Sequence, residues 1–506
     1  MSLERIDALK NKLIFTALML ASLLMLFSCR GKEAAENEAK KDIIVMAIPV
    51  DPDGLDPHAT ASASTFQITN NIYETLISVD KNGNLIPSLA DSWTISEDGL
   101  SIRFHLRDNA FFSNGKECNS EAVIASFERL KSDKGIRSKD YAFISSMEAD
   151  GRDVIFHFDS LDVAALSSFA YAWSAVVDAS SDNLKSNPIG TGPYKLSSWI
   201  PQQALTLERN EYYKGEVKND GVRFVVMPDL TAEITALERG EVDLILITGD
   251  LSSAVENKGF KILAEAGNGL QLMAMNLANP ALSDIRVRQA INYAVNKDEL
   301  IDAVWWGYGE KIGSHYPVVL KEYVDLSDTY GYDVDKARAL LKEAGYEDSL
   351  ELKMYLPKNY QEYVNAGLVI AASLEKVGIK VDVNIVEWAY WLSEVYSGRN
   401  YDLTVVGHTG RLDPYALLVK YQSDGKENYF NYKNERVDEL LSLYKTELDE
   451  DKRTGYVKEI QRILAKDVPA LYIQDPIQIY VTKPEIEGFA SYPINIYQMK
   501  DVYRIK

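Results

Sequence analysis

Short apolar runs alternate with longer amphipathic runs along most of this chain, and that alternation limits the fold more than any other feature. The segment DIIVMAIP at 42–49 has the pattern of a buried strand, and ASTFQITNNIYETLISVD at 63–80 has that of a helix followed by a strand. At 435–467 the pattern predicts two amphipathic helices, followed by the apolar strand VPALYIQDPIQIYVT at 468–482. Alternating strands and helices are typical of layered α/β proteins.

Length and composition set the number and kind of domains. The 506 residues are too many for one ordinary core and indicate two or three domains, while 46% apolar and 25% charged residues exclude a disordered or collagen-like chain. No fixed-period repeat follows the N-terminal segment, which argues against solenoids and propellers. Asn82-Gly83 predicts a hairpin turn rather than a calcium loop, because Gly83 does not stand where a DxDxDG loop needs glycine.

The N-terminus has the layout of a secretory signal. Basic residues precede the uncharged run LIFTALMLASLLMLF at 13–27, which is followed by Ser28 and Cys29. As a helix this run spans about 22 Å, short of the roughly 30 Å hydrocarbon core of a bilayer. We therefore expect residues 1–28 to be a signal peptide rather than a permanent membrane span.

Residues 26–29, LFSC, resemble a bacterial lipobox, so we expect lipidation of Cys29, with an unlipidated signal peptide as the alternative. Residues 29–41 are charged and rich in alanine, as expected of a flexible tether. This arrangement predicts a location in the cell envelope, anchored by lipid to a membrane and facing the periplasm or exterior. Lipidation would leave Cys118 as the only thiol, which excludes an intrachain disulfide and a cysteine metal site.

The chain is strongly acidic, with 75 acidic and 54 basic side chains and a formal net charge of −21. Such a surface is a poor partner for nucleic acid or for anionic lipid headgroups. We expect the charge to keep the protein soluble and predict no nucleic-acid partner.

A search for catalytic motifs finds no GxxxxGK[ST] phosphate loop, no HExxH and no GxSxG. No two of the five histidines lie three or four residues apart, and His105 and His157 alternate with apolar residues as strand residues do. We therefore predict no catalytic residue, no metal site and no cofactor. Carboxylates are plentiful and two of them could meet in space, so an exported hydrolase stays open as an alternative.

Aromatic residues are the most unusual part of the composition. The chain has 30 tyrosines and seven tryptophans, many in segments such as YAWSAVV, VWWGYG, NYQEYVN and VEWAYWLSEVY. Tyrosine and tryptophan combine a rigid apolar face with a polar edge, which suits a cleft that encloses a varied ligand. Ordinary core packing is the alternative for any single one of them.

Several motifs together resemble the large-class solute-binding proteins of bacterial ABC importers, the group of oligopeptide, dipeptide and nickel binders. They include the LDP at 55–57, the segment from IYETL at 72 through PSLADSW, SEDG and FHLRD, and NPIGTGPYKLSSW at 187–199. ALERGEVDLI at 236–245, NLANPALSDIRVRQAINYAVNKDELI from 276, DVDKARALLKEAGY from 333 and NERVDELL from 434 are also similar. The resemblance runs from about Asp42 to the C-terminus.

The resemblance implies a two-lobed periplasmic-binding-protein fold of the large class, with a two-segment hinge and an extra subdomain in the first lobe. Mapped onto this chain, the core of the first lobe comprises 42–65, 181–269 and 479–506. The extra subdomain is 66–180 and the second lobe is 270–478. The lobes of such proteins close on their ligand, which would be delivered to an ABC permease served by separate ATPase subunits.

Ligand residues are implied by the same resemblance, chiefly in VVGHTGRLDPYALL at 405–418. Peptide binders of the group hold the ligand amine with an Asp a few residues before an acidic-Pro pair, which here is Asp413-Pro414. The expected Asp falls on Gly410 or Arg411, and neither can neutralise an ammonium. Arg411 would favour a carboxylate or another anion, unless it is a structural ion-pair partner of Asp413 or another acid.

Further ligand residues follow from the same comparison. Nickel binders place a histidine where this chain has Tyr415, and His408 stands where peptide binders have a ligand-facing Trp. Lys358 lies near a carboxylate-binding position of dipeptide binders, and Trp388, expected at the end of the strand VDVNIVEW, is a cleft aromatic. We predict a peptide or peptide-like solute without the usual amine clamp, and a metal chelate is the alternative within the family.

Overall fold

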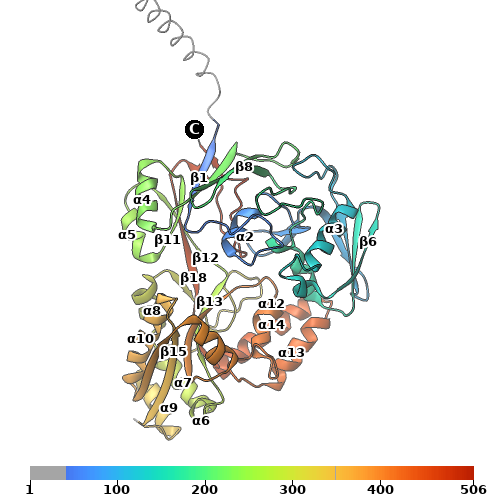
Figure 1. The fold of residues 1–506 in the computed structure, drawn as a ribbon. Coiled ribbons are helices and arrows are strands. Elements are labelled where there is room, and N and C mark those ends of the chain that lie inside the picture. Colours follow the sequence, from blue (N-terminus) through green and yellow to red (C-terminus); the bar gives the residue numbers. More distant parts are fainter. Residues whose placement is uncertain (1–40, 348, 506) are drawn as a thin grey trace, which may run out of the picture. The chain divides into compact units, whose positions relative to one another are not determined.

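A single strand, β18 (Ala470–Thr482), takes part in two groups of strands within one sheet (Figure 1). The computed structural model describes residues 41–347 and 349–505, and the chain from Ile44 to the C-terminus forms one compact unit. Residues 1–28, Cys29 and the tether as far as residue 40 lie outside the described residues, so the signal and lipidation predictions stay predictions. Among the residues described, no helix combines the length and the apolar character needed to cross a membrane.

The first strand set pairs with the C-terminal half of β18 and consists mainly of antiparallel strands. Its members are β1 (Ile43–Ile48), β8 (Tyr194–Ile200), β9 (Ala204–Arg209), β10 (Gly221–Val226), β11 (Leu244–Ile247) and β12 (Lys261–Ala266). The helices α2 (Ala63–Thr69), α4 (Leu230–Arg239) and α5 (Ser252–Val255) belong to the same part of the chain. Helix α4 begins where the Asp229 side chain accepts two backbone N–H bonds and ends at Gly240, whose φ is 76°.

The second strand set pairs with the N-terminal half of β18. Its members are β13 (Gly269–Met275), β14 (Gly309–Lys311), β15 (Leu350–Pro357), β16 (Ile379–Val386) and β17 (Leu403–Thr409). Along the sheet the order is β16-β15-β17-β13-β18, and β15 runs parallel to both β16 and β17. The set therefore contains three adjacent parallel strands, as a βαβ arrangement requires.

Nine helices of the described residues accompany the second set. They are α6 (Pro280–Ser283), α7 (Ile285–Ala294), α8 (Lys297–Trp305), α9 (Val334–Glu343), α10 (Gln361–Glu375), α11 (Trp388–Tyr390), α12 (Pro414–Leu418), α13 (Glu435–Thr446) and α14 (Glu450–Asp467). The two helices and the strand expected near the C-terminus are confirmed as α13, α14 and β18. Asn434 and Asp449 start the two helices, since each side chain accepts two N–H bonds of the first turn.

The chain between β1 and β8 forms a separate four-stranded antiparallel sheet, which packs against α3 (Ser120–Lys131). Its strands follow the order β4 (Ala90–Ile95), β5 (Ser101–Leu106), β7 (Asp153–Phe158) and β6 (Ile144–Asp150). The hairpin predicted at Asn82-Gly83 is confirmed, since it joins β2 (Ile77–Val79) to β3 (Leu85–Pro87) and Gly83 has a φ of 83°. Near the C-terminus, β19 (Ile486–Glu487) and β20 (Tyr503–Arg504) form a two-stranded antiparallel sheet.

Short helical turns complete the described structure. They are η1 (Ser138–Tyr141), η2 (Val163–Phe169), η3 (Ala172–Ser174), η4 (Gly249–Leu251) and η6 (Val419–Tyr421), together with the π-helical turn η5 (Trp391–Ser397). Of these, η3 and η5 contribute aromatic side chains to the candidate site.

The chain passes between the two strand sets at two adjacent places, which together we call the double crossing. Gly267 and Asn268 link β12 to β13, and beside them β18 passes from one set to the other at Asp475 and Pro476. The Gly267 amide donates to the Pro476 carbonyl oxygen at 3.0 Å, and the Gly269 amide donates to Asp475 Oδ1 at 2.9 Å. Burial raises the pKa of Asp475 to about 7. The polar pair Gln474-Asp475, in the middle of an otherwise apolar strand, thus lies at the double crossing.

Candidate functional site

The carboxyl ends of three neighbouring parallel strands bring the candidate residues together. Pro357 of β15 lies beside Val386 of β16, and β17 runs in the same direction on the other side of β15. Lys358, Trp388 and Arg411 each follow one of these strand ends within two residues. Ligands of α/β proteins bind outside the carboxyl ends of parallel strands, which makes this edge the candidate binding site.

Trp388 begins an aromatic series along this edge. The strand β16 ends at Val386, so Trp388 does not end the strand as expected but is the first residue of α11, directly after the N-cap residue Glu387. Its ring stacks on Trp391 with centroids 4.9 Å apart and meets Tyr360 edge-on at 5.2 Å. Trp391 is almost fully buried and donates its indole N–H to Thr404, which fixes the partly exposed Trp388 on a rigid base.

His408 ends the same aromatic series on β17. The rings of Trp391, Tyr396, Tyr429 and His408 follow one another at centroid distances of 5.9, 5.2 and 5.9 Å. Nε2 of His408 shares a 2.8 Å hydrogen bond with the Tyr429 hydroxyl. Burial lowers the pKa of His408 to about 3, so the ring is neutral at pH 7 and acts as an aromatic surface with a polar edge.

The histidine ring also lies beside a second one. The centroids of His408 and His315 are 5.0 Å apart, and the buried His315 bonds through Nδ1 to the Tyr421 hydroxyl. In the described parts of the chain, no group of three or more histidine, cysteine or acidic side chains could hold a metal ion.

Asp413 caps the helix that follows the loop. It is buried, its Oδ1 accepts the Ala416 amide at 3.1 Å, and its Oδ2 accepts the Tyr444 hydroxyl at 3.1 Å. Burial raises the pKa of Asp413 to about 6. Both carboxylate oxygens thus have partners within the protein.

Tyr415 is the second residue of this helix and is partly buried. Its hydroxyl is 3.5 Å from Gln422 Oε1, and the Lys445 ammonium lies 5.1 Å from its ring centroid. This cation–π contact places Tyr415 near α13.

Gly410 has no room for a side chain. Its amide donates to the Asn268 carbonyl oxygen at 2.7 Å, and a Cβ at this position would lie 2.0 Å from Asn268 O and Oδ1. The missing acid at this position therefore has a steric cause in this fold, and an aspartate here would require the double crossing to move.

Arg411 is partly buried, and its guanidinium has neither a hydrogen bond nor an ion pair with any residue that the structure describes. No ion pair with Asp413 or another acid, the alternative expected for it, is found among the described residues. The next residue, Leu412, donates its amide to the Tyr171 hydroxyl at 3.0 Å. The 410–413 loop thus contacts the segment that follows the four-stranded sheet.

Lys358 lies at the solvent-exposed rim of the site. Its ammonium pairs with Glu387 at 2.7 Å, and both side chains are about two-thirds exposed, at 65% and 68%. This pair raises the pKa of Lys358. Lys358, which follows β15, is thus paired with the residue that precedes Trp388. Arg411 and Asp413 follow β17, on the other side of β15.

Two aromatic residues of the site were not predicted individually. Tyr171 and Trp173 stack with centroids 4.3 Å apart and an interplanar angle of 7°, and Phe66 meets Trp173 edge-on. Their only sequence signal is their place in the aromatic segment YAWSAVV. Asn268 carried no signal, since its role depends on the distant loop at 410–413.

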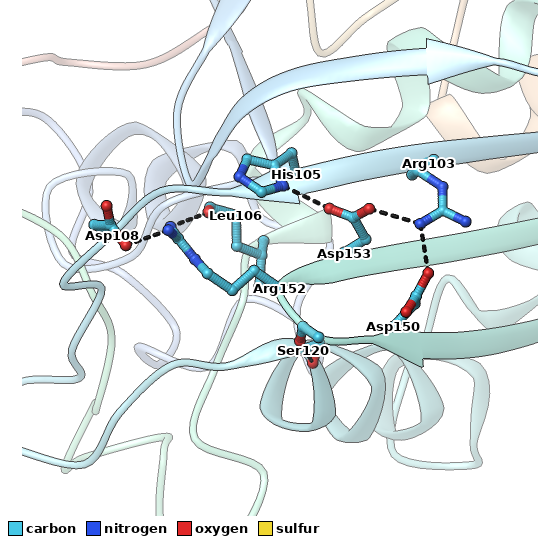
Figure 2. A network of polar contacts seen from close by, with 9 residues as sticks. Arg103, His105, Leu106, Asp108, Ser120, Asp150, Arg152 and Asp153 are labelled. Atoms are coloured by element: carbon cyan, nitrogen blue, oxygen red, sulfur yellow. Dashed lines mark hydrogen bonds and ion pairs between the residues drawn. The ribbon is translucent and has the colours of Figure 1, made fainter.

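A histidine–carboxylate pair outside this edge, His105–Asp153, belongs to a network of polar contacts (Figure 2). The prediction that His105 and His157 are strand residues is confirmed, since they lie on β5 and β7. Nδ1 of His105 is 2.6 Å from Asp153, which also accepts a bond from Arg103. The Ser120 hydroxyl is within hydrogen-bonding distance of the Gly151 carbonyl oxygen at 2.8 Å and of Glu121 Oε2 at 3.1 Å. Among the described residues no hydrogen bond joins it to His105, so the serine, the histidine and Asp153 do not form a triad.

Comparison with known proteins agrees with this architecture. The chain is 27% identical to the dipeptide-binding protein of Escherichia coli, over 93% of this chain and 95% of that one. It is 26% identical to heme-binding protein A of Haemophilus influenzae, over 95% and 97% of the two chains. The crystal structure of the ABC transporter substrate-binding protein CtaP from Listeria monocytogenes matches with a TM-score of 0.81 and 25% identity, over 92% of this chain and 100% of that one.

The family match covers most of the site. Residues 84–429 match the model of the bacterial extracellular solute-binding proteins, family 5 (Middle), a stretch that contains all three strand ends and the 410–413 loop. Members and relatives of this family are substrate-binding proteins. The chain belongs to the bacterial extracellular solute-binding proteins of family 5.

Proposed function

We propose that this protein captures a peptide or peptide-like solute and delivers it to the permease of an ABC importer, whose ATPase subunits supply the energy. The observation that carries the proposal is the meeting of three parallel strand ends, an aromatic wall and the 410–413 loop at one edge of the second strand set. Relatives named as dipeptide-binding and di/tripeptide-binding proteins support a peptide as cargo.

We propose two lobes that close on the solute, and the presence of two strand sets supports this division. We assign 42–65, 181–269 and 479–506 to the core of the first lobe, 66–180 to its extra subdomain, and 270–478 to the second lobe. The double crossing at Gly267-Asn268 and Asp475-Pro476 would be the hinge, since the chain passes between the strand sets there. Closure would then depend on contacts that form only around the bound solute.

Trp388, His408 and Tyr415 would contribute aromatic surface, Arg411 and Lys358 positive charge, and Asp413 the cap that holds α12 in place. This arrangement can bind a solute by stacking and by charged hydrogen bonds, and it needs no nucleophile. We therefore propose a transport receptor without catalytic activity. A lipid on Cys29 would hold the receptor at the membrane of the cell envelope, close to its permease.

Two measurements on the purified protein test the proposal. Mass spectrometry of the material released by denaturation should identify peptides or peptide-like solutes. Small-angle scattering should show a smaller radius of gyration after the solute is added back, and Trp388→Ala should weaken this response because it removes the exposed member of the stacked pair. A bound metal found by elemental analysis, or product release in a hydrolase assay, would contradict the proposal.

Lipidation is tested separately. Protein produced with its leader in a bacterial host should carry an acyl-modified N-terminal cysteine by mass spectrometry, and Cys29→Ala should abolish that modification and release the protein from membranes. An unmodified cysteine in membrane-free protein would contradict the anchor.

A further inference from the structure

The 410–413 loop carries one basic residue, Arg411, and one acidic residue, Asp413. The Arg411 guanidinium lacks a hydrogen bond or ion pair in the described part of the chain. A partly buried guanidinium loses much of its hydration, so it is stabilised by an anionic partner with two oxygen acceptors.

The acidic group closest in sequence cannot supply that partner. Both oxygens of Asp413 are engaged by the Ala416 amide and the Tyr444 hydroxyl, and Gly410 is packed against Asn268. The loop therefore offers no carboxylate to a solute ammonium, and what it offers is the guanidinium of Arg411.

A second guanidinium, that of Arg137, contacts the aromatic pair to which the loop is bonded. The Arg137 guanidinium lies 4.2 Å from the centroid of the Trp173 ring, which stacks on Tyr171. One of its terminal nitrogens pairs with the half-exposed Asp140 at 3.1 Å, and its Nε is buried without a partner in the described structure. This arginine thus retains unused hydrogen-bonding capacity.

Tyr171 connects the loop that carries Arg411 to the ring that Arg137 contacts. Burial raises the pKa of Tyr171 to about 12, and the positive charges of Arg411 and Arg137 both act against that rise. The Tyr171 hydroxyl accepts the Leu412 amide at 3.0 Å, so the phenol joins the loop to the aromatic pair. Arg137 thus lies over one ring of the stacked pair, and the other ring is bonded to the residue that follows Arg411.

We propose that Arg411, assisted by Arg137, binds a carboxylate of the solute, so that this protein carries an anionic peptide-like molecule and does not require a free α-amine. The inference rests on the proposed function, because it assumes that the solute lies at this edge. The carboxylate can be the C-terminus of a peptide or an acidic side chain, and both present the same pair of oxygens.

A peptide library in four forms tests the proposal. Protein freed of bound material by unfolding and refolding is mixed with random di- to pentapeptides that have free termini, an acetylated N-terminus, an amidated C-terminus, or both modifications, and captured peptides are identified by mass spectrometry. Acetylation should change capture by less than twofold. Amidation should lower capture at least tenfold, except for peptides with Asp or Glu, which separates the two sources of the carboxylate.

Variants connect the selectivity to the residue. Arg411→Gln should lower capture of carboxylate-bearing peptides at least tenfold, Arg411→Lys should restore part of it, and Arg137→Gln should cause a smaller loss. Arg462→Gln, at an exposed arginine of α14, is the matched control and should leave capture unchanged. Thermal unfolding of each variant verifies that it is folded.

The outcomes separate the inference from the proposed function. Capture that requires a free amine and ignores Arg411→Gln would overturn the inference and leave the peptide receptor standing. Arg411-dependent binding of succinate or citrate, with no peptide captured, would overturn the peptide proposal and support the anion site. Folded protein that captures neither peptides nor these acids would overturn both.

Discussion

The amide of Gly410 donates a 2.7 Å hydrogen bond to the carbonyl oxygen of Asn268, and the Asn268 side chain donates in turn to the Pro493 carbonyl oxygen. Asn268 has a φ of 54°, a left-handed conformation that asparagine tolerates better than most residues. Three segments that are distant in the sequence are thus held together: the double crossing, the loop after β17 and the C-terminal segment. The loop that carries Arg411 is therefore positioned by the crossing itself.

Gly410→Ala should destabilise the protein, because the new Cβ would lie 2.0 Å from Asn268 O. We expect a loss of about 1–3 kcal/mol in the free energy of unfolding, the usual cost of an overpacked site. Urea denaturation measures it. Gly455→Ala is the control, since Gly455 lies within α14 with no atom within 4 Å of the added Cβ, and it should be stabilising by roughly 0.5–1 kcal/mol. Equal effects of the two substitutions would contradict the packing argument.

Glu74 and Arg107 form a bidentate ion pair with two bonds of 2.7 Å, and their side chains are only 11% and 21% exposed. Arg107→Met should lower the free energy of unfolding by about 3–5 kcal/mol, because it leaves a carboxylate buried without its partner. Glu74→Leu with Arg107→Met should cost clearly less than the sum of the single variants. A double-mutant cycle measured by denaturation provides the test, and additive losses would show that the pair is not coupled.

The sequence predicted elements better than it predicted contacts. The hairpin at Asn82-Gly83 and the helices of 435–467 were predictable because their turn, cap and periodicity signals are local. The Glu74–Arg107 pair was not, although both residues belong to the quoted motifs, since nothing in either segment shows that they meet. The family resemblance gave the fold because it covered nearly the whole chain.

For the candidate site as well, the sequence indicated individual residues but not the contacts between distant segments. The family resemblance implied Trp388, Lys358 and Arg411 as ligand residues, and the structure places all three after the ends of neighbouring parallel strands. The steric reason for Gly410 could not be seen, because the packing partner Asn268 is far away in the sequence. The approach of Tyr171 to the loop depends in the same way on tertiary structure.

Glu233 should make the protein less stable as the pH rises. It is fully buried on α4, and neither carboxylate oxygen has a hydrogen-bond partner among the described residues. Burial raises the pKa of Glu233 from 4.5 to about 8. The folded state thus retains a proton that the unfolded state loses, and the free energy of unfolding should fall by about 1.4 kcal/mol per pH unit between about pH 4.5 and 8.

Glu233→Gln should remove this part of the pH dependence. The difference in unfolding free energy between the variant and the wild type should therefore grow from pH 4.5 to 8 and level off above it. Asp413 and Asp475, whose pKa values burial raises to about 6 and about 7, act in the same direction and should leave a residual slope in the variant. Denaturation at a series of pH values checks this, and parallel curves would refute the assignment.

Glu387 competes with the solute for Lys358 if Lys358 binds a carboxylate. The 2.7 Å pair is exposed, so breaking it should change the free energy of unfolding by at most about 1 kcal/mol. Glu387→Gln frees the ammonium and should raise the affinity for a carboxylate-bearing peptide by at most about fivefold, as expected for a pair of that strength. Titration calorimetry with the peptide selected from the library measures the change.

Lys380→Met, which breaks a comparable exposed pair with Glu351, is the matched control for the loss of a surface ion pair and should leave the affinity unchanged. Lys358→Met should lower the affinity, and combining it with Glu387→Gln should abolish the gain, because the only effect of the glutamine is to release that ammonium. A gain that persists without Lys358 would show that Glu387 itself repels the solute, and an unchanged affinity in all three variants would remove Lys358 from the binding site.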